Sequence, residues 1–273
     1  MLQEITFSRF VYPDTNILGM LAEDLAMWRP LQDFLYRHDL CIAISAAQVA
    51  ELSEARTLHT NLNTLLTAIP SVLIKPPDMI LDEEVRSYPH RRTDTLVLYY
   101  LNALFGKQDF AQFLSSPELA EARRQQRLTA KQMRRRFDAL KPNLPPSESG
   151  EYTWEQAEEF AWINTLQWLA DTHLPFLQRF KDKASDLKAE VFLSVQLFGY
   201  AIFYKYYLHG KQPELTDFGD MFHLFAIPYC KLAILERDMS NVLNHIKSHH
   251  RVLDGAVVQN VDFFRDWMWD EEQ

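Results

Sequence analysis

Cysteine, glycine and long apolar runs are all scarce in this chain of 273 residues. Its two cysteines, Cys41 and Cys230, are too few for a disulfide framework and too far apart in sequence for a metal-binding knuckle, which indicates a reducing compartment. None of the seven glycines belongs to the sequence motif of a phosphate-binding loop, a nucleophile elbow or a glycine-rich dinucleotide turn. No segment has the apolar length of a membrane span, and residues 1–4 lack the basic start of a secretion signal. We therefore expect a soluble, cytoplasmic protein that makes no contact with a membrane.

Basic residues are also in deficit, because 28 Lys and Arg stand against 37 Asp and Glu, for a formal net charge of −9. An acidic chain repels polyanions at long range, which argues against a general nucleic-acid coat protein. This leaves room for a local basic groove and for a site that holds cations. Hydrophobic residues make up 47% of the chain, enough to bury a sizeable core in one large domain or in a domain with a substantial insertion.

Short apolar segments alternate with helical periodicity at both ends of the chain. Strands are predicted at 10–13, 41–45, 71–75 and 232–235, with a candidate edge strand at 252–259. Helices are predicted at 17–38, with Pro30 as a break between two helices, and at 46–55, 60–69, 221–229, 239–249 and 261–269. Strands separated by helices indicate a parallel sheet with helices on its faces. The predicted fold is therefore α/β, a three-layer α/β/α arrangement around a mostly parallel sheet of about four to five strands.

Residues 80–213 show helical periodicity alone, and we expect no strand there. Helices are predicted at 93–105, 117–140, 153–169 and 184–209, and the clearest linker is 140–150. The predicted division is an α/β core of residues 1–79 and 214–273 with an all-helical insertion at 80–213. One insertion helix is strongly basic, and either the acidic start of the next helix pairs with it or it forms a ridge that binds RNA. The candidate RNA-binding residues are Arg123, Arg124, Arg127, Lys131, Arg134 and Arg135.

Four acids lie where predicted strands end or in the helices beside them: Asp14, Glu51, Asp220 and Asp238. Parallel strands place such positions at one edge of the sheet, where open α/β sheets bind ligands. The alternatives are an N-cap role for Asp14 and an ordinary solvated glutamate at position 51. Several carboxylates in one pocket repel each other unless cations neutralise them, which favours Mg²⁺ or Mn²⁺ over zinc. Metals held in this way support in-line hydrolysis of a phosphodiester.

The stretch Asp14-Thr15-Asn16-Ile17-Leu18 after a strand, with Glu51 and the Asp220–Asp238 pair, resembles the PIN-domain family of metal-dependent ribonucleases. The helix at 221–229, with His223 and Ala226-Ile227-Pro228-Tyr229, is similar to that of a toxin-like bacterial branch. The likeness covers about the first third and last fifth of the chain, not the helical middle.

The resemblance implies a metal site with defined roles. Asp14, Glu51 and Asp220 would be metal ligands and Asp238 the fourth acid, with Thr15 and Asn16 supporting, the latter by orienting Asp14. This chain departs from the bacterial branch at Lys231 and at Glu236, which competes with Asp238 for the fourth position. Toxin-like relatives also imply a neutralising antitoxin or other protein partner, and pairing into a homo-oligomer.

The leading hypothesis is an endoribonuclease that cleaves single-stranded RNA with Mg²⁺ or Mn²⁺. DNA stays open as a substrate, because nothing in the sequence shows how a 2′-hydroxyl would be read. The competing hypothesis is a catalytically inactive PIN-like module that binds or assembles through its helical insertion. His223 is either a phosphate-contacting or proton-shuttling residue, or a core histidine with one satisfied nitrogen. An aspartyl-phosphate phosphatase is disfavoured, because Asn16 cannot act as a general acid.

Overall fold

The structure of the chain is a computed structural model, and it describes residues 9–90, 96–101, 112–113, 117–147, 150–210 and 212–262. Its centre is a six-stranded sheet in the order β4-β3-β2-β1-β5-β6. The strands are β1 (Phe10–Pro13), β2 (Cys41–Ile44), β3 (Ser71–Ile74), β4 (Val97–Tyr100), β5 (Leu232–Leu235) and β6 (Val257–Asn260). All neighbouring strands are parallel except β3 and β4, which are antiparallel. The α/β class and the mostly parallel sheet are therefore confirmed, but the sheet has six strands and not the four to five predicted.

Strand β4 corrects the prediction that residues 80–213 are all helical. A helix was predicted at 93–105, but Val97, Tyr99 and Tyr100 pair with residues of β3. Valine and tyrosine fit a pleated strand, and four residues are too few for periodicity to separate strand from helix. The outer residues of that predicted helix, 93–95 and 102–105, lie outside the described residues.

Two hydrophobic cores are separated by the sheet, because successive strand residues point to opposite faces. In β2, Ala43 belongs to one core, and its neighbours Ile42 and Ile44 belong to the other. The second core is completed by α1 (Thr15–Glu23), α2 (Trp28–Arg37) and α4 (His59–Ala68). The helical break predicted at Pro30 lies instead at residues 24–27. Pro30 stands in the first turn of α2, where proline is tolerated because that amide has no helical partner.

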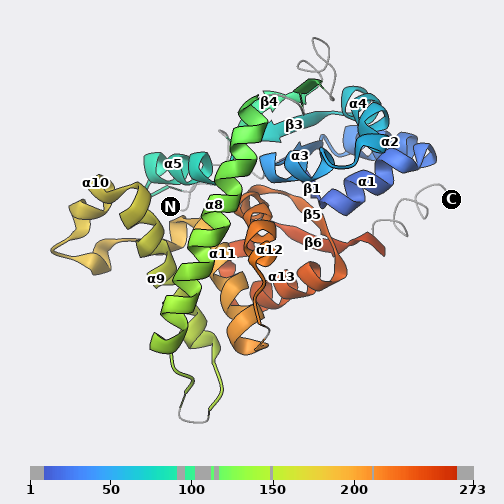
Figure 1. The fold of residues 1–273 in the computed structure, drawn as a ribbon. Coiled ribbons are helices and arrows are strands. Elements are labelled where there is room, and N and C mark those ends of the chain that lie inside the picture. The colour runs from blue at the N-terminus through green and yellow to red at the C-terminus, as the bar shows by residue number, and fades with distance from the viewer. Residues whose placement is uncertain are drawn as a thin grey trace.

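The larger core contains side chains of the sheet together with those of the helical middle. The elements that contribute to it include α5 (Pro77–Ser87), α8 (Pro117–Leu140), α9 (Trp154–Thr172), α10 (Leu174–Leu177) and α11 (Leu193–Phe203). The π-helix η7 (Tyr204–Leu208) continues α11. The single helix predicted at 184–209 therefore consists of two 3-10 turns, then α11, then the π segment. Figure 1 shows α8 crossing the molecule, with α9 and α10 on one side and α3 (Ala46–Leu52) and α12 (Leu215–Asp220) on the other.

The last part of the chain returns to the sheet. The 3-10 helix η8 (Met221–Tyr229) follows α12 directly and leads into β5, and α13 (Arg237–His249) then connects β5 to β6. The candidate edge strand is present, but it begins at Val257. The predicted helix at 261–269 lies almost wholly outside the described residues. Within the part of the chain that the structure describes, no helix combines the length and the apolar character needed to cross a membrane.

Candidate functional site

Asp14 directly follows β1 and stands between the ends of two neighbouring strands. Its amide donates to the carbonyl of Ile234 in β5 (2.7 Å), which continues the pairing of the two strands. Its carboxylate Oδ1 accepts from the Thr15 amide (2.7 Å), and Oδ2 accepts from the Glu236 amide just after β5 (3.3 Å). Asp14 is therefore both the cap of α1 and an acid at the carboxyl edge of the sheet, so the two interpretations of this residue are compatible.

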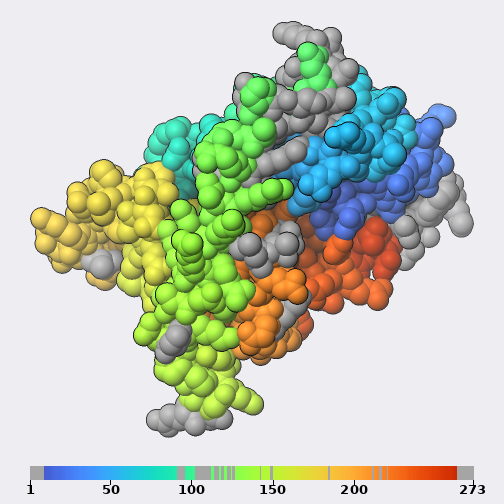
Figure 2. Space-filling view, in the orientation of Figure 1, coloured from blue at the N-terminus to red at the C-terminus, as the bar shows by residue number. Residues whose placement is uncertain are grey.

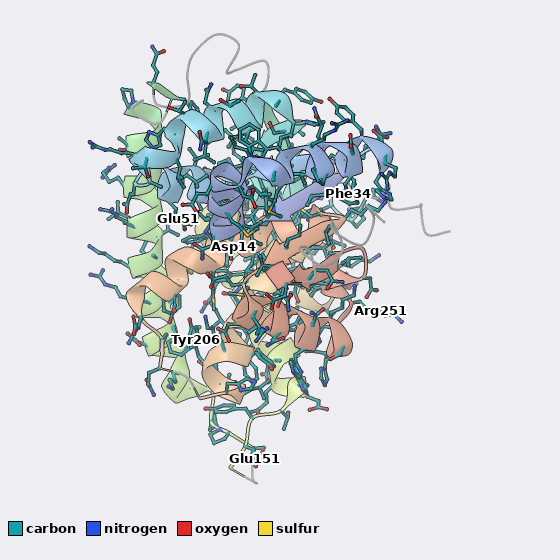
Figure 3. All side chains as sticks on the ribbon, turned by 90° about the vertical axis from the view of Figure 1, so that its right-hand side faces the viewer. Asp14, Phe34, Glu51, Glu151, Tyr206 and Arg251 are labelled. Atoms are coloured by element: carbon teal, nitrogen blue, oxygen red, sulfur yellow. The ribbon has the colours of Figure 1, made fainter. Side chains whose placement is uncertain are left out.

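Glu51 reaches the same edge from the neighbouring strand. It lies on α3, which begins directly after β2, and β2 pairs with β1. The Thr15 hydroxyl donates to its Oε2, and Nε2 of His223 lies 2.9 Å from its Oε1. The half-buried Glu51 is thus tied to the start of α1 and to η8, and it is not an ordinary solvated glutamate. Figure 3 shows Asp14 and Glu51 close together.

The start of α3 is fixed by a capping box. Ser45 accepts from the Gln48 amide (3.2 Å), and the Gln48 side chain accepts from the Ser45 amide (2.8 Å). The fully buried Gln48 side chain also donates to the Pro13 carbonyl at the end of β1. Because one side chain joins the ends of β1 and β2, the position of Glu51 relative to Asp14 is set by the backbone of both strands.

His223 has partners for both ring nitrogens, unlike the core histidine with one satisfied nitrogen. Nδ1 lies 2.8 Å from the Tyr12 hydroxyl and 3.5 Å from Ser45 Oγ, and Tyr12 donates to Ser45 Oγ (3.0 Å). An ionised carboxylate can only accept, so Nε2 is the protonated nitrogen that donates to Glu51. The ring is therefore fixed between a buried tyrosine and a carboxylate of the candidate site.

These contacts shift the pKa of two members of the site. Burial alone would raise the pKa of Glu51, but hydrogen bonding and charge attraction from His223, with the Thr15 hydroxyl, lower the pKa overall. Burial raises the pKa of Tyr12 well above its ordinary value, and nearby Asp14 and Glu51 raise it further. At neutral pH Glu51 is therefore a carboxylate and Tyr12 a neutral hydroxyl.

Glu236 and Asp238, the two candidates for the fourth acid, face different neighbours. The side-chain amide of Asn16 donates to the Glu236 carboxylate, so Asn16 orients Glu236 and not, as the resemblance implies, Asp14. Asp238 lies 3.9 Å from the ammonium of Lys205 in the π-helix, and its side chain is 74% exposed, against 12% for Lys205. Of the two acids, Glu236 is the one that the structure places beside Asp14.

Asp220 is the last residue of α12 and lies three residues before His223. Its backbone is described, but its side chain lies outside the described part of the chain. Lys231 is exposed at the opposite, amino-terminal end of β5, so it is remote from the strand end that carries Glu236. Among the side chains that the structure does describe, no group of three His, Cys, Asp or Glu residues is arranged to hold a metal ion.

The basic helix α8 packs against α3 and α12, the two elements that carry Glu51 and Asp220. Its predicted pairing with the acidic start of the next helix, at Glu151, Glu155, Glu158 and Glu159, is not found among the described ion pairs. The pairs present are Arg124–Glu121, Arg134–Asp138 and Arg136–Asp171. Arg127, Lys131 and Arg135 are exposed, and the side chain of Arg123 lies outside the described residues.

Two members of the site were not predicted from sequence, Tyr12 and Ser45 as a contact of His223, and neither was the contact of Lys205 with Asp238 outside it. Tyr12 lies within an apolar strand and was assigned to the core, and Lys205 lies in an aromatic helix. Ser45 and Gln48 do carry a readable signal, the spacing of a capping box. Their contacts with His223 and with β1 depend on segments distant in sequence.

Comparison of the chain with models of protein families, with curated proteins and with solved structures finds no match.

Proposed function

We propose that this chain is a divalent-metal-dependent endoribonuclease that hydrolyses phosphodiester bonds of single-stranded RNA, on a three-layer, PIN-like α/β/α fold. One observation carries the proposal: acids from the ends of three adjacent parallel strands are joined into one hydrogen-bonded group. Asp14 follows β1, Glu51 follows β2 and Glu236 follows β5. The carboxyl edge of such a sheet is where open α/β folds bind ligands.

The donor set suits a hard divalent ion. Oxygen ligands favour Mg²⁺ or Mn²⁺, and the residues that would hold the ion are Asp14, Glu51 and Asp220, with Glu236 as the fourth acid. The three of these acids whose side chains are described do not form a metal-binding group by themselves, so the Asp220 side chain would have to complete the site. A carboxylate has about four acceptor sites, so the hydrogen bonds to Asp14 and Glu51 leave lone pairs available. When bound, the ion would lower the pKa of a coordinated water and stabilise charge on the phosphate.

The surrounding side chains hold these acids in place. Thr15 and His223 each donate to one oxygen of Glu51, which fixes its orientation and keeps it ionised. Asn16 holds Glu236 in the same way. Because Nε2 of His223 donates to Glu51 and Nδ1 contacts Tyr12, His223 acts in this proposal as a positioning residue and not as a proton shuttle.

The same contacts favour a second candidate, an inactive PIN-like module that binds or assembles through its helical segment. His223 and Thr15 already stabilise the Glu51 carboxylate, and the ammonium of Lys205 already lies beside Asp238, without an ion. A module of this kind would need no metal. Binding of a divalent ion therefore separates the two functions.

The test is cleavage of labelled single-stranded RNA with Mg²⁺ or Mn²⁺, together with calorimetric titration of Mn²⁺. Asp14→Asn and Asp220→Asn should each abolish cleavage and weaken Mn²⁺ binding, and a chelator should abolish cleavage by the wild type. Asp33→Asn, an exposed acid on α2, is the matched control and should behave like the wild type. Wild-type protein that neither cleaves RNA nor binds Mn²⁺ would establish the inactive module instead.

A further inference from the structure

Positive charge is concentrated in one helix of an acidic chain. Seven of the 28 Lys and Arg residues lie between Pro117 and Leu140, against three acids in the same helix. The chain as a whole has a net charge of −9, so the basic helix is set against a background of opposite sign. A local field of this kind attracts a polyanion to one place on the surface.

The basic side chains of α8 do not surround the helix evenly. Ala130, Met133 and Phe137 face the protein interior, and Phe137 packs against aromatic rings of η7 and α12. At about 100° per residue, the six candidate RNA-binding residues fall within an arc of roughly 120° that begins beside this buried face. Arg136 alone among the seven lies on the opposite flank, where it pairs with Asp171 of α9.

The direction of the arc is fixed by Arg134. Its guanidinium donates to the carbonyl of Pro213, just before α12, and pairs with Asp138. The side of α8 that carries the arc is therefore the side of α12 and α3, and not that of α9. Figure 1 shows α12 and α3 on one side of α8 and α9 on the other, and Figure 2 shows α8 exposed along its length beside these elements.

Within the arc, Arg127, Lys131 and Arg135 are exposed, and none of them forms an ion pair with a described residue. Arg124 is already paired with Glu121, and Arg134 with Asp138 and Pro213. The three exposed residues, here called the α8 basic stripe, recur every four residues, about 6 Å along the helix axis. Evenly repeated charges suit a ligand whose charges also repeat.

We propose that the α8 basic stripe binds the phosphate backbone of single-stranded RNA and guides the strand to the edge of the sheet where Asp14 and Glu51 lie. The inference rests on the proposed function for the identity of the polyanion. Its own support is the packing of α8 against α3 and α12, which places the stripe beside the elements that carry Glu51 and Asp220. The net negative chain accounts for the need for such a guide, because RNA would otherwise be repelled.

Salt dependence measures the number of phosphates that the stripe neutralises. For single strands, the logarithm of the affinity falls with the logarithm of salt concentration with a slope of about −0.7 per contact. Loss of three contacts should therefore reduce the slope by about 2. At about 0.1 M salt, the affinity should fall about 100-fold.

The experiment compares the wild type with the triple variant Arg127→Gln, Lys131→Gln, Arg135→Gln. Anisotropy of a labelled, unstructured RNA is measured in EDTA, where no cleavage occurs, over a series of salt concentrations. A second triple variant, Lys181→Gln, Lys183→Gln, Arg251→Gln, has the same change in net charge at exposed positions away from α8. It should lose only a few-fold in affinity and should keep the slope of the wild type.

The outcomes separate this inference from the proposed function. Equal affinities and slopes for the two triple variants would refute the proposal that the α8 basic stripe binds RNA. Competition by polyglutamate as strong as that by unlabelled RNA would also refute it, and would identify an acidic protein as the partner. If the wild type cleaves both a long RNA and a dinucleotide, the stripe variant should lose kcat/KM on the long RNA alone. If the stripe variant cleaves the long RNA as well as the wild type does, the stripe proposal is refuted and the proposed nuclease function stands. If RNA binding depends on the stripe but the wild type cleaves no RNA, the stripe proposal stands and the proposed nuclease function is refuted.

Discussion

The buried acid Glu84 makes the stability of the fold depend on pH around neutrality. Its side chain is only 5% exposed, at the junction of α5, α11 and η8. One oxygen accepts from the Ser194 amide (2.8 Å) and from the Tyr229 hydroxyl, and the other accepts from the Ser194 hydroxyl (2.6 Å). Burial raises the pKa of Glu84 to about 7 from 4.5, although all three of these hydrogen bonds lower it.

The sign of the effect follows from proton linkage. The folded state binds the Glu84 proton more tightly than the unfolded chain does, so its stabilising contribution is complete below about pH 4.5 and is lost as the pH rises through about 7. With these two values, the free energy of unfolding should fall by about 2 kcal/mol between pH 5.5 and pH 8. This is a large share of the stability of an ordinary domain, which is about 5–15 kcal/mol.

The measurement is urea unfolding of the wild type and of Glu84→Gln across that pH range. Glutamine has nearly the same shape and no charge, so the variant should lose most of the fall in stability between pH 5.5 and pH 8. Asp78→Asn, an exposed acid on the same helix, is the control and should follow the wild-type pH profile. Parallel profiles for the wild type and Glu84→Gln would refute the reasoning, because the pH dependence would then originate elsewhere.

Two further predictions concern the packing of the helical segment and the identity of the fourth acid. A Cβ at Gly199 would lie 2.9 Å from the Cα of Ala161, so Gly199→Ala should lower the free energy of unfolding by about 1–3 kcal/mol in urea. Gly219→Ala, with open space around its Cβ, should be neutral or stabilising by up to about 1 kcal/mol, and equal losses at both sites would contradict this account. Glu236→Gln should weaken Mn²⁺ binding about 10- to 100-fold, whereas Asp238→Asn should leave it within about twofold, as measured by calorimetry. If Asp238→Asn weakens Mn²⁺ binding more than Glu236→Gln does, Asp238 is the fourth acid of the metal site.

Local chemistry made part of the fold predictable. Strand β5 and helix α8 have the predicted bounds, because each is a clear pattern flanked by strong breaks. Strand β4 was missed because its four residues acquire their structure from pairing with β3, a tertiary effect that propensity does not contain. The π-helix after α11 was also invisible, since its aromatic residues satisfy ordinary helical periodicity.

The candidate site was predictable as a group of strand ends, but its hydrogen bonds were not. Tyr12 and His223 are separated by 211 positions in sequence, and Asn16 and Glu236 by 220. No local pattern specifies which of these groups meet, because the contacts depend on how β1, β2 and β5 stand side by side. For this reason Asn16, which was expected to orient Asp14, orients Glu236 instead.

Glu236 and Asp238 show why neighbouring acids at a helix start can serve different parts of a molecule. Glu236 occupies the N-cap position of α13, and Asp238 lies two residues further on, in the first turn of the helix. At about 100° per residue, the two side chains leave the helix roughly 200° apart. The Glu236 side chain therefore turns to Asn16 at the start of α1, while the Asp238 side chain turns to the π-helix and Lys205. A single strand-to-helix junction thus contributes one acid to the candidate site and places the other beside the helical segment.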